Sequence, residues 1–360
     1  MDGYAVKAKD TFGATESLPA MLEVMGEVGM GHIPSISVGG GQAVKISTGG
    51  MIPHGSDGVV MIEHCHLLDD MTIEVSRPIA PLENVIQPND DFRKGETILK
   101  KGWRLRPQDV GILAGFGISK IPVYKRPKVA IISTGDEIVP ISEKVEPGKV
   151  RDINSYTLSA FCSQTGAVPI LMGLCTDNYN KLRGMVEEGL EIGDTVWISG
   201  GSSVGSRDIT LKVLESLSNM EILVHGISIS PGKPTIIARI GCRAVFGLPG
   251  HTASAMVVAE VFLTPFIARI SGQEHSTPLS YYQVEAELRR NIESASGRED
   301  YIRVRLVEED GKLKADPIFG KSALISTLVN ADGLVRVDRN KEGLYQGEIV
   351  KVMMFHYYRG

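Results

Sequence analysis

The stretch TVWISGGSSVGSRD, residues 195–208, indicates the fold class of the protein. Residues 195–199 are mostly apolar and β-branched, which predicts a short buried strand. From about Asp208 a helical pattern begins, with three leucines spaced along one face. A strand, a glycine-rich turn and a helix in succession predict one unit of a parallel α/β sheet.

The turn inside this stretch predicts an anion site. Gly200, Gly201 and Gly205 let the backbone approach a ligand closely, and Ser199 and Ser203 add hydroxyl donors. Backbone N–H groups and the dipole at a helix N-terminus hold anions. The pattern is neither a Walker loop nor the spaced dinucleotide fingerprint. Taken alone it is equally compatible with an ordinary βα turn, so the type of anion stays open.

The composition is that of a globular protein with ample core. The 360 residues are 42% hydrophobic and 22% charged, which predicts several domains. A net charge of -5 gives no basic surface of the kind that binds nucleic acid. We also expect no apolar run long enough to span a bilayer. We therefore predict no nucleic-acid partner and no membrane partner. The four cysteines lack metal-binding spacing, which predicts core thiols in a reducing, cytoplasmic compartment.

Patterning divides the chain into four parts, residues 1–87, 88–126, 127–272 and 273–360. The first is a β-rich lobe of short apolar runs between Gly, Pro and Asp turns. The second is a connector in which Pro107 opens a short helix and a strand follows over 121–124. The last shows alternating runs that fit a small β-barrel or sandwich.

Residues 127–272 alternate strands and helices, which predicts a doubly wound, mostly parallel sheet. We expect Asp177 to cap the second helix, and Ser254 to cap a long apolar helix that ends near residue 270. Ligands of such sheets lie beyond the carboxyl ends of the strands. Polar turns follow four of the strands, at 134–137, 199–208, 231–234 and 247–250. Four such turns at one edge are harder to dismiss as plain connections than a single one.

Eight motifs follow one another along the chain in an order typical of one family. They are MDGYA at 1–5, STGGMIPHGSDGVVMIE at 47–63, STGDEI at 133–138, RDINS at 151–155, SGGSSVGSRD at 199–208, SPGKP at 230–234, GLPG at 247–250, and ADGL with a closing GEIVKV within 331–352. With these motifs the chain resembles the molybdopterin molybdenumtransferases of the MoeA type, which include the E domain of gephyrin. The resemblance covers nearly the whole length.

The resemblance implies a transferase of molybdenum cofactor biosynthesis. Such an enzyme inserts molybdate, or tungstate, into adenylylated molybdopterin with release of AMP, and uses Mg²⁺. The implied fold is a multidomain α/β plus β protein, in which a β-rich lobe, a connector and a C-terminal β-barrel accompany the doubly wound domain. The implied pterin- and nucleotide-binding residues are Thr134, Gly135, Ser199, Gly200, Gly201, Ser203, Gly205, Gly232, Pro249 and Gly250.

The resemblance also implies catalytic, metal and molybdate residues. The catalytic set is Asp208, Asp152, Lys233, Asp2 and Thr48. A hard cation takes carboxylate oxygens, here Asp136, Glu137 and Asp208, with Asp152 as a further candidate. A tetrahedral oxyanion takes cations and hydroxyls, here Lys233, Ser254 and Arg298. Plainer interpretations stay open, namely surface charges for Lys233 and Arg298 and helix caps for Asp152 and Ser254.

Members of the family form a two-fold dimer in which the lobe of one chain completes the site of the other. This arrangement implies shared active sites and gives Asp2 and Thr48 a role. A molybdopterin adenylyltransferase is a further expected partner. Relatives carry Asn-Pro after GLPG, where this chain has His251-Thr252, so we expect an altered loop beside the molybdate pocket. They also carry a helical segment before MDGYA, so we expect the sequence to be either a fragment or a shortened form.

Two other functions stay open at this point. One is a scaffold that binds a partner peptide, as gephyrin does when it clusters receptors, although no stretch predicts a peptide groove. The other is a molybdopterin adenylyltransferase, whose single domain is similar to residues 128–272. The additional lobe and barrel disfavour it. The residues do not discriminate molybdate from tungstate.

Overall fold

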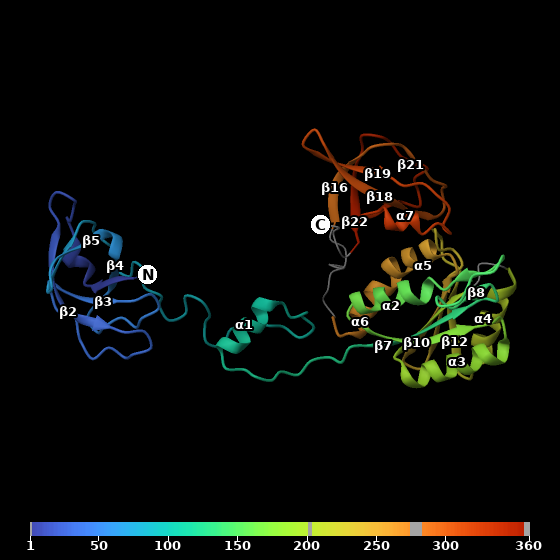
Figure 1. Ribbon diagram of the computed structural model, residues 1–360, viewed down its shortest axis with the longest axis horizontal. Coiled ribbons are helices and arrows are strands. Elements are labelled where there is room, and N and C mark those ends of the chain that lie inside the picture. Colours follow the sequence, from blue (N-terminus) through green and yellow to red (C-terminus); the bar gives the residue numbers. More distant parts are fainter. Residues whose placement is uncertain (1, 201–203, 274–282, 356–360) are drawn as a thin grey trace. The chain divides into compact units, whose positions relative to one another are not determined.

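The computed structural model describes residues 2–200, 204–273 and 283–355, without the side chains of 204–208. It divides into two compact units, Met1–Ile98 and Leu99–Gly360. The first unit is the β-rich lobe, and the second holds helix α1, the α/β domain and the C-terminal barrel (Figure 1).

Six strands in the order β4-β1-β3-β2-β6-β5 form the sheet of the lobe. They are β1 (Gly3–Val6), β2 (Ala20–Val28), β3 (Gln42–Ile46), β4 (Gly58–Met61), β5 (Cys65–Asp69) and β6 (Thr72–Val75), with short 3₁₀ turns η1 (Ala8–Thr11) and η2 (Ile62–His64). The last three residues of the MDGYA motif, Gly3 to Ala5, lie in β1, which pairs antiparallel with β3 and β4. Tyr4 and Val6 enter one core and Ala5 another, so this short strand is buried on both faces.

Helix α1 (Pro107–Gly115) is the one regular element of the connector. Pro107 is its first residue, as predicted, and Asp109 accepts hydrogen bonds from the backbone and guanidinium nitrogens of Arg106. The strand predicted over 121–124 is wrong, because these residues form no ladder. Pro122 has no N–H to donate to a neighbouring strand, and Val123 is exposed.

Six further strands form the sheet of the α/β domain in the order β10-β7-β11-β15-β14-β12. They are β7 (Lys128–Thr134), β10 (Val168–Cys175), β11 (Thr195–Gly200), β12 (Met220–His225), β14 (Ile236–Ile240) and β15 (Arg243–Pro249). The helices are α2 (Asn154–Gln164), α3 (Tyr179–Ile192), α4 (Val204–Ser216), α5 (Thr252–Val258), the π-helical turn η3 (Ala259–Leu263) and α6 (Thr264–Ile270). The first four strands of the order run parallel, and β14 and β12 add an antiparallel edge.

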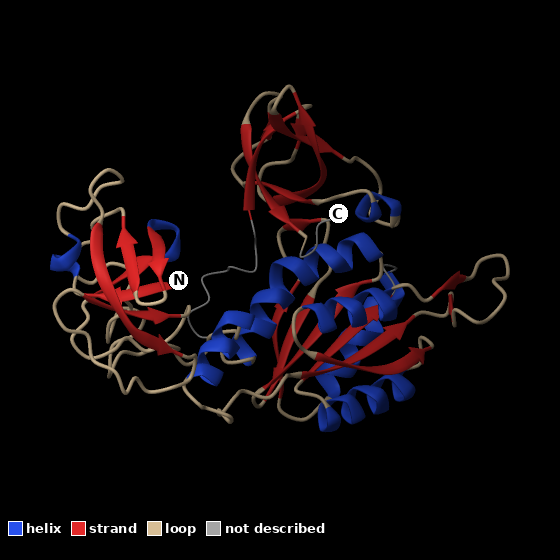
Figure 2. Cartoon of the chain, turned by 60° about the vertical axis from the view of Figure 1, so that its left-hand side comes forward, coloured by secondary structure: helices blue, strands red, loops and turns tan. Residues whose placement is uncertain are grey.

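Neighbouring residues of the central strands face opposite cores. Ile131 and Trp197 pack in the core that contains residues of α2, α5 and α6. Ile132 and Ile198 pack in the core that contains residues of α3 and α4. Helices therefore cover both faces of the sheet (Figure 2), and the predicted doubly wound arrangement is confirmed.

Three helix starts differ from the sequence-based expectation. Helix α4 begins at Val204 rather than near Asp208, because the polar residues that open it carry no apolar period. The N-cap of α3 is Asn178, whose Oδ1 accepts from the backbone N of Lys181 at 3.0 Å, and not Asp177. Ser254 lies inside α5, which His251 precedes as N-cap residue, so the capping role expected for Ser254 is wrong.

The segment Thr252–Ile270 is a continuous helix of 19 residues, long and apolar enough by composition to cross a membrane. The expectation that no apolar run reaches this length is therefore wrong. Its most apolar window is 56% buried inside the protein. Ala255, Val258 and Leu263 pack in the core beside the sheet. This burial accounts for the apolar composition, as in the core helix of a globular protein.

The C-terminal part is a closed five-stranded barrel, as predicted. Its strands are β16 (Gln283–Leu288), β18 (Glu299–Glu309), β19 (Lys312–Pro317), β20 (Gly333–Val337) and β22 (Ile349–Met354). Closure arises because β18 pairs with both β19 and β20. Strand β13 (Ile229–Ser230), which follows β12 in the chain, pairs in parallel with β18 and so ties the α/β domain to the barrel. Shorter elements are β8 (Ile138–Val139), β9 (Val150–Arg151), β17 (Ile292–Glu293), β21 (Gly343–Leu344) and α7 (Ser326–Val329).

All four cysteines are free thiols. Cys162 and Cys175 are buried, and burial raises the pKa of the Cys162 thiol to about 12. Cys242 is exposed in the turn between β14 and β15, so the prediction that all four are core thiols is wrong for this residue. A hairpin turn projects past the sheet and leaves its side chains in solvent.

Candidate functional site

Three of the four predicted strand-end motifs meet at the carboxyl edge of the α/β sheet, whereas SPGKP follows β13, which pairs with the barrel strand β18. Gly200 of β11 pairs in register with Thr134 of β7 and with Pro249 of β15. Only glycine fits at 200, because a Cβ there would lie 2.1 Å from Cγ2 of Thr134. Three residues that the sequence proposed as ligand-binding thus lie side by side.

Asn154, at the start of α2, joins these strand ends to one another. Its Nδ2 donates to Oγ of Ser199 and to the carbonyl oxygen of Gly250, each at 2.7 Å. Its Oδ1 accepts from Oγ1 of Thr252 at 2.7 Å. Asn154 is only 6% exposed. The residue lies within the RDINS motif, but the sequence offered no signal for its role between the turns.

Asp152, which lies just before α2, accepts hydrogen bonds from its neighbours. Its Oδ1 accepts from the backbone N of Ser155 at 3.0 Å and from Oγ of Ser133 at 3.1 Å. Asp152 is buried, and these contacts satisfy an N–H at the start of α2. The helix-cap interpretation fits them, and a catalytic or metal-binding role for Asp152 stays a prediction.

An acidic edge follows β7 and β10. Asp136 and Glu137 are exposed after β7, and the carboxylate of Asp136 accepts from the backbone N of Asp177 at 3.0 Å. Asp177, which the sequence did not propose for the site, accepts from Oγ1 of Thr134 at 3.2 Å. Burial, together with the charges of Asp136 and Glu137, raises the pKa of Asp177.

The chemistry of these carboxylates fits a hard cation such as Mg²⁺, which takes one or two protein carboxylates and completes its shell with phosphate oxygens and water. Among the described side chains, no three His, Cys, Asp or Glu residues lie close enough to form a complete metal site. The side chain of Asp208 lies outside the described residues, as do Gly201 and Ser203, and Gly205 falls in the first turn of α4.

The SPGKP turn follows β13. Gly232 has φ of +131°, and a Cβ there would lie 2.7 Å from Cγ2 of Val258 in α5, so the turn requires glycine. Lys233 is exposed, and its carbonyl oxygen accepts from the backbone N of Ile227 at 2.9 Å. The close packing of Gly232 and this hydrogen bond hold the backbone of the lysine in place.

A cavity of about 310 Å³ lies where the SPGKP turn meets the barrel. Its wall includes Ser230, Pro231, Arg298, Asp300, Arg303 and Ser322. Of the three residues predicted to bind molybdate, Arg298 is in this wall, whereas Lys233 and Ser254 are not. Lys233 lies two residues after Pro231, and Ser254 is buried in α5.

Two arginines give this cavity its chemistry. Arg298 and Asp300 form an ion pair with Nε 2.9 Å from Oδ1, and Nη2 of Arg298 donates to Oδ2 of Asp300 at 3.3 Å. Arg303 is 6% exposed and donates from Nη2 to the carbonyl oxygen of Gly320 at 3.0 Å. Its Nε has no hydrogen-bond partner among the described residues. Burial lowers the pKa of the Arg303 guanidinium. A buried guanidinium with an unused donor beside a polar cavity fits an oxyanion ligand.

The sequence missed Arg303 and Ser322 as members of this cavity. Arg303 occurs within an alternating run that predicts a strand. In such a strand a charged residue is expected to face solvent. Ser322 lies in a loop with no motif that marks it. The pairing of β13 with β18, which no local pattern predicts, brings the barrel to the SPGKP turn.

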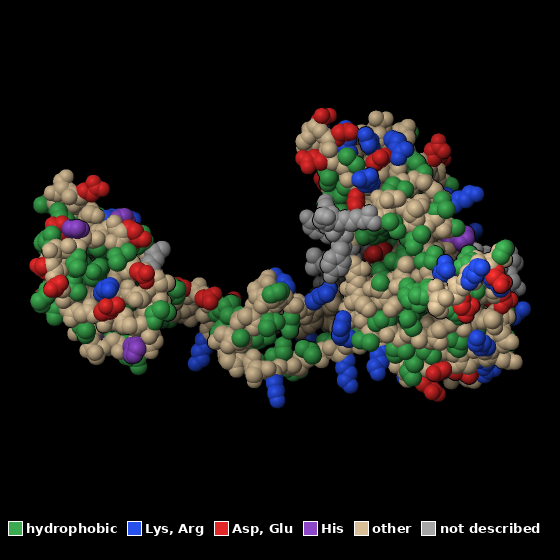
Figure 3. Space-filling view, in the orientation of Figure 1, with side chains coloured by type: hydrophobic (Ala, Val, Ile, Leu, Met, Phe, Trp, Pro, Cys, Tyr) green, Lys and Arg blue, Asp and Glu red, His purple; other side chains and the backbone are tan. Residues whose placement is uncertain are grey.

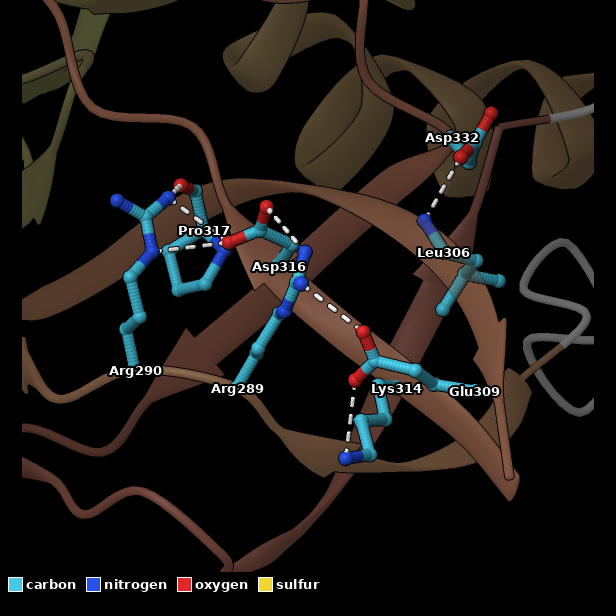
Figure 4. Close-up of polar contacts among 8 residues, drawn as sticks. All are labelled: Arg289, Arg290, Leu306, Glu309, Lys314, Asp316, Pro317 and Asp332. Atoms are coloured by element: carbon cyan, nitrogen blue, oxygen red, sulfur yellow. Dashed lines mark hydrogen bonds and ion pairs between the residues drawn. The ribbon is translucent and has the colours of Figure 1, made fainter. Parts of the chain in front are cut away.

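A network of charged side chains supports the barrel wall of the cavity (Figure 4). Arg289 contacts Glu309 at 3.0 Å and Asp316 at 3.5 Å, and Arg290 contacts Asp316 at 2.8 Å. Arg290 also lies over the ring of Phe319, which is part of the cavity wall, at 5.4 Å. Each exposed pair contributes little alone, but together they connect residues 289–290, which follow β16, with β18 and β19.

In the lobe, Asp2 and Thr48 contact one another directly. Oδ1 of Asp2 accepts from the backbone N of Thr48 at 2.7 Å and from its Oγ1 at 3.0 Å. These hydrogen bonds lower the pKa of the Asp2 carboxyl. The structure therefore brings this predicted pair together within the lobe, at an exposed turn after β3.

Comparison with known proteins covers the chain from end to end. The MoeA N-terminal region (domain I and II) matches residues 1–117, a probable molybdopterin binding domain matches 130–269, and the MoeA C-terminal region (domain IV) matches 285–355. A putative molybdopterin biosynthesis protein of Methanocaldococcus jannaschii is 34% identical over 98% of this chain and 84% of its own. A molybdopterin molybdenumtransferase of Bacillus subtilis is 31% identical over 98% and 82%. The crystal structure of a molybdopterin biosynthesis MoeA protein from Pyrococcus horikoshii has a TM-score of 0.78 and 36% identity, and the match covers 99% of this chain and 87% of that one.

Proposed function

The chain belongs to the MoeA family of molybdopterin molybdenumtransferases, enzymes of molybdenum cofactor biosynthesis, and on this premise we propose that it inserts molybdate into adenylylated molybdopterin and releases AMP. The observation that carries the proposal is the cavity beside the SPGKP turn, with the buried Arg303 and its unused Nε. A tetrahedral dianion matches this donor set. The registered strand ends at Thr134, Gly200 and Pro249 supply a separate edge for the pterin and the nucleotide.

In this proposal Arg298, Arg303 and Ser322 hold the oxyanion, and Lys233 adds charge at its approach. Mg²⁺, held by Asp136 and Asp177 with Glu137 and Asp208 as further candidates, would neutralise the phosphates of the adenylylated substrate. Gly135, Gly250 and the glycine-rich turn after β11 would bring backbone donors to the same substrate. We propose a cytoplasmic enzyme that receives its substrate from a molybdopterin adenylyltransferase.

The test of this function is an insertion assay with adenylylated molybdopterin, Mg²⁺ and either molybdate or tungstate, scored by AMP release. In this assay we expect Lys233→Ala to raise the oxyanion concentration needed for half-maximal rate about tenfold, because one charge-assisted contact to an anion is lost. The pterin concentration dependence should change much less. Lys212→Ala, which removes an exposed lysine from α4, is the matched control. Equal losses for both substrates would instead assign Lys233 to phosphate binding.

We further propose that the enzyme is a homodimer with shared active sites. Support comes from the connector, where large apolar side chains lie in solvent: Trp103 is 48% exposed, Val110 55%, Phe116 49% and Val123 70%. Figure 3 shows hydrophobic side chains gathered over the segment around α1. Contiguous apolar surface of this kind marks an interaction site. A second copy of the chain is the partner that the proposal assigns to it.

Mixing two inactive variants tests the shared site. We expect Asp2→Ala and Asp208→Ala chains each to lose AMP release, and their equimolar mixture to recover about a quarter of wild-type activity. The reason is that half of the re-formed dimers are mixed, and each mixed dimer holds one intact site of two. Subunit exchange is followed by native mass measurement. Exchange without recovery would show that the site is built within one chain.

A further inference from the structure

Two contacts join the segment after GLPG, in the α/β domain, to the cavity residue Ser322. Nδ1 of His251 lies 2.8 Å from Oγ of Ser322. The backbone N of Ala253, two residues on, donates to the carbonyl oxygen of Ser322 at 3.2 Å. The loop after GLPG therefore holds Ser322 by both its hydroxyl and its carbonyl, at the wall of the oxyanion cavity.

The direction of the His251 contact decides what Ser322 offers to a ligand. A serine hydroxyl has one proton and two lone pairs. If Nδ1 accepts that proton, only lone pairs face the cavity, and they repel an anion. If Nδ1–H donates to Oγ, the hydroxyl proton is left for the cavity. A bound dianion favours the second arrangement, because it stabilises a donor that points toward it.

We propose that His251 is a positioning residue that donates Nδ1–H to Ser322 and thereby directs the Ser322 hydroxyl proton at the oxyanion. The inference rests on the proposed function, since it assumes that the cavity binds molybdate or tungstate. It gives a purpose to the residue at which this chain departs from the Asn expected after GLPG. The neutral imidazole tautomer with a proton on Nδ1 is sufficient for this role.

A set of substitutions at 251 separates a donor from a mere structural contact. In asparagine, Nδ2 lies the same number of bonds from Cα as Nδ1 of histidine, so His251→Asn keeps a donor in reach of Ser322. His251→Asp places an oxygen at the same position, which can only accept the hydroxyl proton and brings a negative charge. His251→Ala removes the contact. If the contact were only structural, Asp would weaken binding through its charge alone, and the difference between Asn and Asp would persist unchanged in the Ser322→Ala background.

The experiment measures binding of molybdate alone, and of tungstate alone, to the full-length chain by equilibrium dialysis at pH 8. We expect His251→Asn to stay within about threefold of wild type, His251→Ala to weaken binding about fivefold, and His251→Asp to weaken it by roughly 30-fold or more. In the Ser322→Ala background, His251→Ala should have no further effect, because the two residues act through one hydroxyl. Thermal unfolding of the Asn and Asp variants checks that both fold alike.

The outcomes distinguish this inference from the function on which it rests. A wild-type chain that retains neither oxyanion overturns the anion cavity and the inference with it. A wild-type chain that binds, with Asn and Asp variants of equal affinity, overturns the donor role of His251 alone. Additive effects of His251→Ala and Ser322→Ala likewise overturn it. The expected rank order of the three variants, with no further loss in the Ser322→Ala background, supports it.

Discussion

Asn154→Ala is expected to lower the free energy of unfolding by about 3 kcal/mol and to remove most of the AMP release. The side chain makes three hydrogen bonds of 2.7 Å, to Ser199, Gly250 and Thr252. A buried hydrogen bond contributes about 1 kcal/mol net, and each orphaned partner adds a desolvation cost. Ser199 lies near the end of β11, Gly250 follows β15 and Thr252 opens α5, so the loss also loosens the edge proposed to bind the substrate.

Unfolding in urea, followed by the fluorescence of Trp197, measures this effect close to the site. Trp197 lies fully buried in β11, two residues before Ser199, and Trp103→Phe in every variant removes the second tryptophan of the chain. Ser163→Ala on the same helix is the control, because its hydroxyl makes an exposed bond to the Ser159 carbonyl. A stability loss no larger than that of the control would show that the Asn154 contacts do not hold the strand ends together.

Glu260→Gln is expected to stabilise the protein by about 3 kcal/mol at pH 8 and to have little effect near pH 4.5. Glu260 is 5% exposed within the π-helical turn η3, and burial raises the pKa of its carboxyl to about 7 from 4.5. A raised folded-state pKa means that the protonated form contributes stability that is fully present below pH 4.5. That stability is lost as the pH rises from 4.5 to 7, by about 1.4 kcal/mol for each pH unit. Glutamine keeps the neutral shape and removes the titration.

Unfolding free energies at pH 5, 6, 7 and 8 for wild type and Glu260→Gln test this expectation. The difference should grow from pH 5 to 7 and then level off. Glu191→Gln, which removes an exposed carboxylate from α3, should give a difference that is small and independent of pH. A constant difference for Glu260→Gln across the range would mean that the carboxyl does not titrate in this window.

Local patterns were sufficient for most of the architecture. Runs such as 129–132, apolar at every position, indicate a strand buried on both faces, and the alternation with helices then requires a parallel sheet. Parallel strands end at the same edge, so the convergence of the polar turns after β7, β11 and β15 followed from sequence order. The helix start at Pro107 is likewise a consequence of short-range chemistry, whereas the alternating runs fitted a barrel or a sandwich, and the pairing of β18 with both β19 and β20 closes the barrel.

The partners of the functional side chains were decided only by the tertiary structure. Asn154 meets Gly250 and Thr252 across 96 and 98 residues, and His251 meets Ser322 across 71. No period or motif encodes such pairs, because they depend on which loops the completed sheet and the β13–β18 pairing bring together. Burial was also decided by the tertiary structure. By composition, helix 252–270 is long and apolar enough to span a membrane, but its residues pack in the core beside the sheet. Periodicity specifies which face of an element is apolar, whereas the fold decides what that face and its neighbouring polar groups contact.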